Sequence, residues 1–152
     1  MNSKTAPALC QPDNLGMLLA MVRTEIVKAV EAELSQRGLD LRFTQFLILR
    51  RLDVLGPMGA SELARVVELD GGAMTRQLDQ LEARGVLRRV PHEQDRRALR
   101  IELTAPGKVL CKSVHECAAR VIEESQKQLN PTERVQLQDY LERVLHTLRN
   151  KD

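Results

Sequence analysis

The sequence predicts a mainly α-helical chain that contains one small β-hairpin. Over most of the 152 residues apolar side chains recur with the spacing of an amphipathic helix. Only residues 86–103 change to the pattern of two short strands around a polar loop. Glycine and proline stand between these segments, where the chain has to turn.

Composition excludes several classes of protein. No apolar run approaches the roughly 18 residues that span a bilayer, and the first residues lead into no apolar signal segment. Three cysteines without regular spacing do not suggest a disulfide framework, which favours a reducing cytoplasm. The aromatic residues, Phe43, Phe46 and Tyr140, are too few for a protein that stacks bases of single strands. We therefore expect one cytoplasmic domain that does not contact a membrane.

The N-terminal part is predicted to form an arm and two helices. Residues 1–13 are polar, contain two prolines and are expected to be a flexible arm. A helical pattern runs over 15–36, and Gly38 ends it. A second pattern covers 44–55 and stops before Pro57, because proline cannot continue the hydrogen-bond ladder.

Two further helices joined by a tight turn are predicted next. Residues 61–67 form the first, with Ser61 as a plausible cap. The second is capped by Asp70 and ends at Gly85. Its apolar face consists of Met74, Leu78 and Leu81. Its opposite face carries Gly72, Arg76, Asp79, Gln80 and Ala83, with Thr75 and Gln77 beside them.

The C-terminal half is predicted to contain the hairpin and two long helices. Residues 86–90 and 99–103 form the strands, and the charged stretch between them forms the loop. Thr104 caps a helix that reaches about residue 129. Pro131 then takes the first position of a last helix, which ends near residue 149.

This order of elements is typical of a winged helix-turn-helix. A helix fits the major groove of B-DNA if its outer face carries small or polar residues that can approach base edges. A charged hairpin tip beside that helix can reach the neighbouring minor groove, where narrow A·T tracts attract arginine.

The positive charge is concentrated where such a fold would meet DNA. A net charge of +2 is small, so binding has to depend on the placement of charges. Residues 84–100 contain six arginines, Arg84 and Arg100 included. Arg88 and Arg89 are neighbours on a strand and point to opposite faces, so only one of them can face DNA. We assign Arg88 to DNA and expect Arg89 to be a surface charge or to pair with a carboxylate.

Residues 41–107 resemble the MarR (multiple antibiotic resistance regulator) family of winged helix-turn-helix transcriptional regulators, and the flanking helices match in order and length. The resemblance rests on Ser61-Glu62-Leu63-Ala64, on Met74-Thr75-Arg76-Gln77-Leu78 followed by Leu81-Glu82-Ala83-Arg84-Gly85-Val86-Leu87-Arg88-Arg89, and on Asp95-Arg96-Arg97-Ala98 leading to Leu103-Thr104-Ala105-Pro106-Gly107. It implies that Asp95 orients Arg97 for the minor groove. It also implies a homodimeric repressor that responds to a small phenolic or lipophilic effector and binds a pseudo-palindromic operator.

The fold and the resemblance together give a set of candidate DNA contacts. These are Ser61, Gly72, Ala73, Thr75, Arg76, Gln77, Gln80, Arg88, Asp95, Arg96 and Arg97. One departure concerns Gly71-Gly72-Ala73, which stands where the family usually has larger side chains. The sequence therefore does not identify the bases that this chain reads.

A domain division follows from the same reading. Residues 14–152 form a single MarR-like domain, with the winged helix-turn-helix over about 41–103 and dimerisation helices over about 14–37 and 104–149. The apolar faces of the terminal helices exceed what a small winged-helix domain can cover, and such a stripe normally marks an interface. The residues assigned to it are Val114, Val121, Ile122, Leu129, Val135, Leu137, Leu141, Val144, Leu145 and Leu148.

Two sensing alternatives remain beside this interpretation. Cys111 and His115 have a spacing that can chelate a metal, but the other histidines have no partner at ligand spacing, so a structural cysteine and a surface histidine are favoured. Cys10 lies in the arm, where an exposed thiolate can oxidise, although an inert residue is favoured. Phe43 and Phe46 are assigned to the core, with a role in an effector pocket as the weaker option.

The sequence offers no support for catalysis, a cofactor or a bound metal. It contains no nucleophile elbow, no phosphate-binding loop and no zinc-protease motif. Glu123 and Glu124 are adjacent on a helix, so their side chains point about 100° apart and cannot act together. The rival to a DNA-binding regulator is a winged-helix module that binds proteins and not DNA.

Overall fold

The computed structural model describes residues 14–94 and 98–150. Its elements are α1 (Leu15–Gln36), α2 (Phe43–Leu55), β1 (Met58–Gly59), α3 (Ala60–Val66), α4 (Gly71–Ala83), β2 (Leu87–Pro91), β3 (Leu99–Leu103), α5 (Ala105–Ser125) and α6 (Pro131–Arg149). The predicted mainly α-helical fold with a small β-hairpin is confirmed. No helix in these two ranges is long and apolar enough to cross a membrane.

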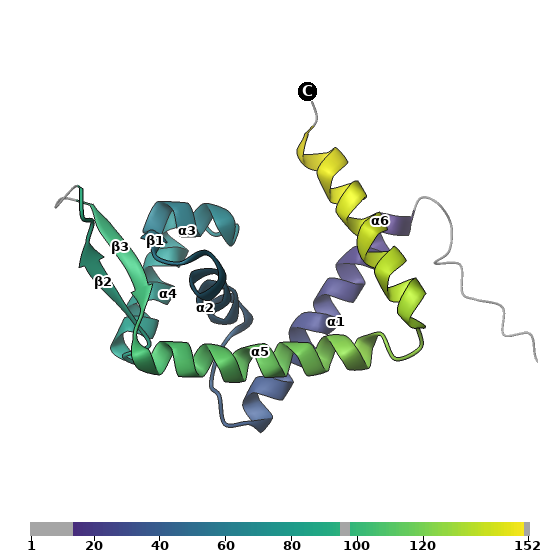
Figure 1. Ribbon diagram of the computed structural model, residues 1–152, viewed down its shortest axis with the longest axis horizontal. Coiled ribbons are helices and arrows are strands. Elements are labelled where there is room, and N and C mark those ends of the chain that lie inside the picture. Colours follow the sequence, from purple (N-terminus) through teal and green to yellow (C-terminus); the bar gives the residue numbers. More distant parts are fainter. Residues whose placement is uncertain (1–13, 95–97, 151–152) are drawn as a thin grey trace, which may run out of the picture.

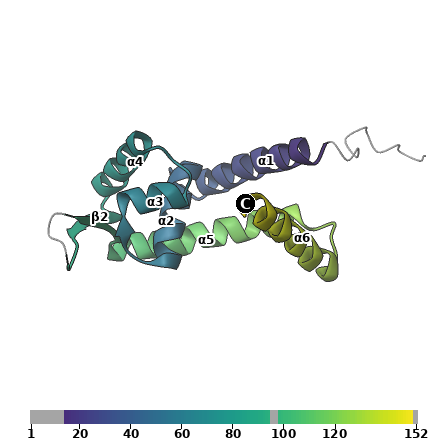
Figure 2. The same ribbon diagram turned by 90° about the horizontal axis from the view of Figure 1, so that it is seen from above.

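The elements separate into a lobe and a set of long helices. Figure 1 shows α2, α3, α4 and the sheet grouped at one end of α5, while α6 projects from the other end. α1 packs against α5 and crosses it at an angle (Figure 1). Figure 2 shows the same helices from above. The lobe is the winged helix-turn-helix, and α5 links it to the terminal helices.

The core of the lobe is built from the apolar faces that the helical periodicity predicts. Its fully buried side chains include Ile48, Leu49, Leu63, Met74, Leu78, Leu81, Leu87 and Ile101. α2 is the central helix, because it contacts α3, α4, α5 and β3. α4 packs against this core through its apolar face, which consists of Met74, Leu78 and Leu81.

Three helices begin with side-chain caps. Asp70 accepts a hydrogen bond from the backbone nitrogen of Ala73, and Thr104 accepts one from Gly107. Asn130 and Glu133 form a reciprocal capping box at the start of α6, with Pro131 at the first position. These bonds satisfy amide groups that no helical turn can satisfy.

Two glycines between α4 and α5 are required by the backbone. Gly85 ends α4 with a φ of +70°, a conformation that glycine adopts without strain. Gly107 lies in the first turn of α5, where a Cβ atom would come within 1.8 Å of the carbonyl oxygen of Val86. Only glycine allows the start of α5 to pack this closely against the beginning of the wing.

The structure corrects several expectations. Ser61 lies inside α3 and does not cap it, since the helix begins at Ala60. α5 ends at Ser125 and not near residue 129, because the backbone bonds Lys127 N–Glu124 O and Leu129 N–Gln126 O tighten the chain into turns.

The sheet contains a third strand, β1, that the sequence analysis missed. Met58 pairs with Ile101 and Gly59 with Arg100, so β1 lies antiparallel to β3 at the edge opposite β2. Its two residues follow directly after the Gly56-Pro57 turn. The short strand connects the end of α2 to the root of the wing.

The long apolar faces divide into a buried part and an exposed part. Val114 was expected at an interface between chains, but it is fully buried within this chain. No residue of α6 is buried, and its apolar side chains lie exposed, as do those of the first half of α1. The exposed apolar residues on these two helices are Leu15, Met17, Leu18, Leu19, Met21, Val22, Val135, Leu137, Tyr140, Leu141, Val144, Leu145 and Leu148.

Candidate nucleic-acid interface

α4 presents one complete face to solvent. Met74, Leu78 and Leu81 are at most 2% exposed and hold the opposite face in the core. The exposed candidates on α4 are Gly72, Thr75, Arg76 and Gln80, with Ala73 and Gln77 half-buried beside them. The ion pairs of the described residues do not include Arg76, so its guanidinium is available to an outside partner.

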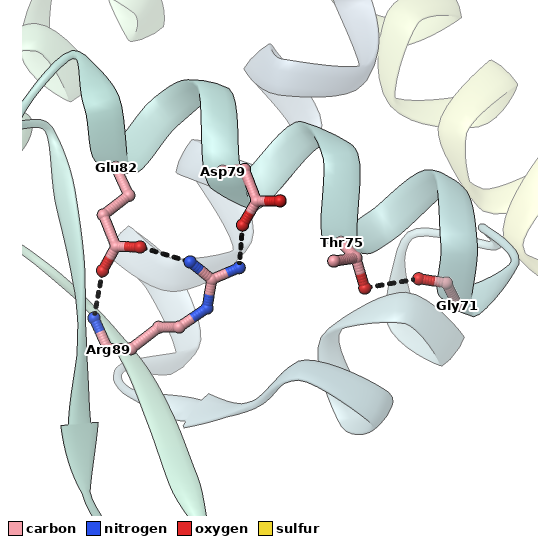
Figure 3. A network of polar contacts seen from close by, with 5 residues as sticks. All are labelled: Gly71, Thr75, Asp79, Glu82 and Arg89. Atoms are coloured by element: carbon pink, nitrogen blue, oxygen red, sulfur yellow. Dashed lines mark hydrogen bonds and ion pairs between the residues drawn. The ribbon is translucent and has the colours of Figure 1, made fainter.

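The first turn of α4 carries little side-chain bulk, although the fold does not demand it. A Cβ atom added at Gly71 would meet nothing within 4 Å, and one at Gly72 would meet only the Asp70 carboxylate oxygen, at 3.4 Å. Thr75 donates its hydroxyl hydrogen to the Gly71 carbonyl oxygen at 2.9 Å (Figure 3). The helix therefore begins with a smooth surface that another molecule can approach closely.

A network of ion pairs ties α4 to the wing. The Arg89 guanidinium on β2 binds the Asp79 carboxylate at 2.6 Å and also binds Glu82 (Figure 3). The backbone nitrogen of Arg89 donates to the second Glu82 oxygen at 3.1 Å. Burial lowers the pKa of Arg89, but its hydrogen bonds to Asp79 and Glu82 outweigh this effect, so that pKa is raised. The expectation that Arg89 pairs with a carboxylate is confirmed.

Arg88 points to the other face of β2, as the strand geometry predicts. It forms an ion pair of 2.5 Å with Glu102, which lies directly opposite on β3. Its side chain stays 63% exposed. The pair holds the arginine at the surface without burying it, which suits a contact with a phosphate group.

Gln80 and Gln77 behave differently from each other. Gln80 is exposed, and its Oε1 accepts a hydrogen bond of 2.9 Å from Nε2 of Gln45 on α2. The Oε1 atom of Gln77 is buried and has no hydrogen-bond partner within the described chain. Sequence reasoning missed Gln45, the one buried polar residue of the described core, which is 5% exposed. The signal for it was its place directly before the apolar run 46–49.

The remaining candidates lie at the edges of this surface. Ser61 is exposed on α3. Asp95, Arg96 and Arg97 lie outside the described residues. The strands that lead to them are in register over five residue pairs, from Leu87–Leu103 to Pro91–Leu99. Arg100 donates to the carbonyl oxygen of Pro57 at 3.0 Å, which anchors β3 to the turn after α2.

Cys111 and His115, considered for metal or thiol sensing, make contacts within the fold. Cys111 is buried, and its thiol donates to the Leu49 carbonyl oxygen at 3.6 Å. Burial, and to a smaller extent the charge of Asp53, raises the pKa of Cys111 to about 11. His115 lies 3.5 Å from Asp53. Within the described ranges these side chains do not form a group of three possible metal ligands; Cys10 lies outside those ranges.

The two phenylalanines lie where the core was predicted. Phe46 is buried, and Phe43 is half-buried and stacks on it with 5.3 Å between ring centroids. Their packing supports the assignment to the core.

Comparisons with known proteins agree with this geometry. Residues 41–99 match the model described as the MarR family. The "Multiple antibiotic resistance protein MarR" of Salmonella typhimurium is 32% identical over 132 residues, which cover 86% of this chain and 90% of the relative. The chain belongs to the MarR family.

Further relatives and solved structures extend the similarity over the whole chain. The "HTH-type transcriptional repressor NicR" of Pseudomonas putida is 29% identical and covers 99% of both chains. A crystal structure of a mutant MarR from E. coli, complexed with operator DNA, has a TM-score of 0.78 and 29% identity, over 92% of this chain and 99% of that chain. This chain is therefore a winged helix-turn-helix transcriptional regulator of the MarR family.

Proposed function

We propose that this MarR-family chain binds double-stranded DNA as a homodimer, with α4 in the major groove and the tip of the β2–β3 hairpin in a minor groove. The exposed face of α4 carries the proposal, because it combines a smooth first turn, an Arg76 that forms no ion pair with another described residue, and acidic residues neutralised by Arg89. The operator complex of the similar E. coli protein supports it.

Each candidate residue receives a role from its position. Arg76 and Gln80 project from α4 toward base edges, with Gly72, Ala73, Thr75 and Gln77 beside them. Arg88 and Ser61 lie at the margins and suit phosphate contacts, which position a protein without reading sequence. For the wing we keep the sequence-based assignment, in which Asp95 orients Arg97 for the minor groove and Arg96 lies beside them.

The exposed apolar side chains of α1 and α6 support the homodimer. They lie on α6 and on the first half of α1, at the end of α5 away from the lobe (Figure 1), so a partner docked there leaves both α4 helices free. We propose that residues 14–152 form one domain, whose dimerisation helices are α1, α5 and α6. Two reading helices about one turn of DNA apart imply a pseudo-palindromic operator with half-site centres roughly 10 base pairs apart.

We propose further that the regulator is a cytoplasmic repressor released by a small molecule. A phenolic or lipophilic effector between the dimer base and the lobe would change the spacing of the two α4 helices and lower DNA affinity by a population shift. The relatives reported above are transcriptional regulators, and the proposal includes no catalytic activity, cofactor or metal.

Binding titrations test the proposal. The DNA is the duplex that the wild-type protein selects from a randomised pool, and the affinity is measured over a series of salt concentrations. Because phosphate contacts release counterions, the logarithm of the binding constant should fall linearly with that of the salt concentration. Arg76→Ala should weaken binding roughly tenfold or more, while Arg143→Ala on α6 serves as a matched loss of one positive charge and should have little effect.

The wing is tested by the sign of one effect. Arg97→Ala should weaken binding by about 1–3 kcal/mol per half-site. Asp95→Ala removes a negative charge, so simple electrostatics predicts tighter binding, whereas loss of the orienting contact predicts weaker binding. Tighter binding by Asp95→Ala together with unchanged binding by Arg97→Ala contradicts the wing assignment. A protein that selects no duplex at all favours the rival, a module that binds proteins.

A further inference from the structure

One buried side chain of α2 forms a hydrogen bond with a glutamine on the exposed face of α4. Gln45 on α2 is 5% exposed and makes two hydrogen bonds in opposite directions. Its Oε1 accepts from the backbone nitrogen of Arg42 at 3.2 Å, and its Nε2 donates to Oε1 of Gln80 at 2.9 Å. The exposed reading face of α4 is thus connected to the interior through an amide pair.

The chemistry of the backbone fixes the direction of this pair. The amide of Arg42 is a donor and cannot accept, so the Gln45 atom beside it must be the oxygen. The amide nitrogen of Gln45 then faces Gln80, and a donor requires an acceptor there. Gln80 therefore turns its oxygen inward. Its own nitrogen makes no hydrogen bond to another described residue and belongs to an exposed side chain.

We propose that Gln45 is a positioning residue that determines base specificity: it holds the amide of Gln80 with only donors facing the major groove. This inference rests on the proposed DNA-binding function. A free glutamine reads adenine best, because it donates to N7 and accepts from the N6 amino group. Because its oxygen is turned inward to Gln45, Gln80 presents no acceptor to the N6 amino group and loses this second contact. Guanine offers two acceptors, O6 and N7, and becomes the preferred base.

The first measurement locates the positions that Gln80 reads and the base preferred there. Each base pair of the selected duplex is varied in turn, and the affinity of wild-type protein and of Gln80→Ala is measured at one salt concentration. Gln80→Ala should remove the preference at one symmetric pair of positions only. At that pair the wild-type protein should favour guanine over adenine, by about fivefold or more.

The second measurement releases the amide. Gln45→Met keeps the size of the side chain but makes neither hydrogen bond, so the Gln80 oxygen becomes free. The preference at the same pair of positions should change from guanine to adenine. Leu52→Met is the control, since it places the same methionine at another buried position of α2, two turns from Gln45, and leaves the Gln45–Gln80 bond in place. It should leave the preference for guanine unchanged.

The outcomes separate this inference from the function on which it rests. A wild-type preference for adenine at the Gln80 positions, or a Gln45→Met variant that still prefers guanine, overturns the inference. A Gln80→Ala variant that keeps every base preference of the wild-type protein also overturns the inference. In that case a loss of DNA binding by Arg76→Ala still supports the proposed function. If Gln45→Met does not fold, the wild-type preference at the positions located with Gln80→Ala decides. Absence of DNA binding by the wild-type protein contradicts the proposed function itself.

Discussion

Asp79 on α4 and Arg89 on β2 are joined by an ion pair of 2.6 Å, which connects the helix proposed to enter the major groove with the root of the wing. Glu82, one turn further along α4, binds the same guanidinium. The arginine thus compensates two carboxylates beside the surface proposed to meet phosphates. It also fixes the angle between helix and hairpin, on which simultaneous binding in two grooves depends.

Replacing Arg89 should therefore weaken DNA binding although Arg89 does not point at DNA. Arg89→Met leaves two negative charges uncompensated on α4 and loosens the wing, and we expect a loss of about 1.4 kcal/mol, or tenfold, in affinity. The folded state should lose about 1 kcal/mol or less, because the carboxylates are partly exposed. Fluorescence anisotropy titration and urea denaturation measure the two effects.

The second change in this experiment separates charge from geometry. Adding Asp79→Asn to Arg89→Met removes one of the uncompensated charges, so part of the affinity should return. A double variant that binds no better than Arg89→Met shows that wing position, and not charge, is what Arg89 supplies. An Arg89→Met variant with wild-type affinity contradicts both explanations, the charge compensation and the fixed wing position.

The buried oxygen of Gln77 should cost stability in the unbound protein. It has no hydrogen-bond partner within the described chain, and an unsatisfied buried acceptor carries a desolvation penalty of about 1–3 kcal/mol. Gln77→Met should leave the free energy of unfolding unchanged or raise it by about 1 kcal/mol. Gln80→Met is the matched comparison and should lower it, because it leaves the Nε2 donor of Gln45 without its acceptor. A larger loss for Gln77→Met in urea denaturation contradicts this account.

The Cys111 thiol should make the folded protein sensitive to alkaline pH. Burial raises its pKa from 9.0 to about 11, so the folded state favours the neutral thiol. The resulting stability is fully present below pH 9.0, the ordinary value, and is lost as the pH rises through about 11. The total loss should be about 1–3 kcal/mol. Cys111→Ala lowers stability at neutral pH, but its free energy of unfolding should decline less between about pH 8 and 11. Thermal melting at each pH measures this decline. An equally steep decline in the variant assigns the effect to other groups.

Local signals in the sequence predicted more of the fold than of the site. The Asp70 cap, the Gly85 stop and the apolar face of α4 involve residues within a few positions of one another, so periodicity and capping rules were sufficient. Strand β1 was missed because two residues carry no period, and its pairing with β3 spans over 40 positions of sequence.

The errors at the site have the same physical origin. The pattern of α5 does not distinguish an apolar residue packed within the chain, such as Val114, from one left for a partner, such as Ile122. The pairing of Arg89 with Asp79, and the bond from Gln45 to Gln80, arise only when α2, α4 and β2 come together. The residue types identified candidates for DNA contact but did not show which atoms these side chains present.

The exposed side chains of α6 lead to the last prediction, which concerns assembly. Leu141 and Leu145 are 39% and 46% exposed, and no residue of α6 is buried in the chain. A charge placed there disturbs little within one chain but would be buried and unpaired in a homodimer, at a cost of several kcal/mol. Leu141→Glu combined with Leu145→Glu should therefore give a 17.2 kDa monomer in sedimentation experiments at micromolar concentration, where the wild-type protein sediments as a dimer.

Val109→Glu provides the matched control for this assembly test. Val109 is 71% exposed and lies in the first turns of α5, at the end opposite α6 (Figure 1). Its replacement by glutamate adds the same charge at an exposed apolar position in the part of α5 next to the lobe, outside the set of apolar residues assigned to the interface, so this variant should remain a dimer. Because an operator of two half-sites is bound by two linked lobes, the α6 variant should also lose affinity for the full operator while its affinity for a single half-site stays the same. A dimeric α6 variant, or a monomeric wild-type protein at micromolar concentration, would require a different role for the apolar face of α6.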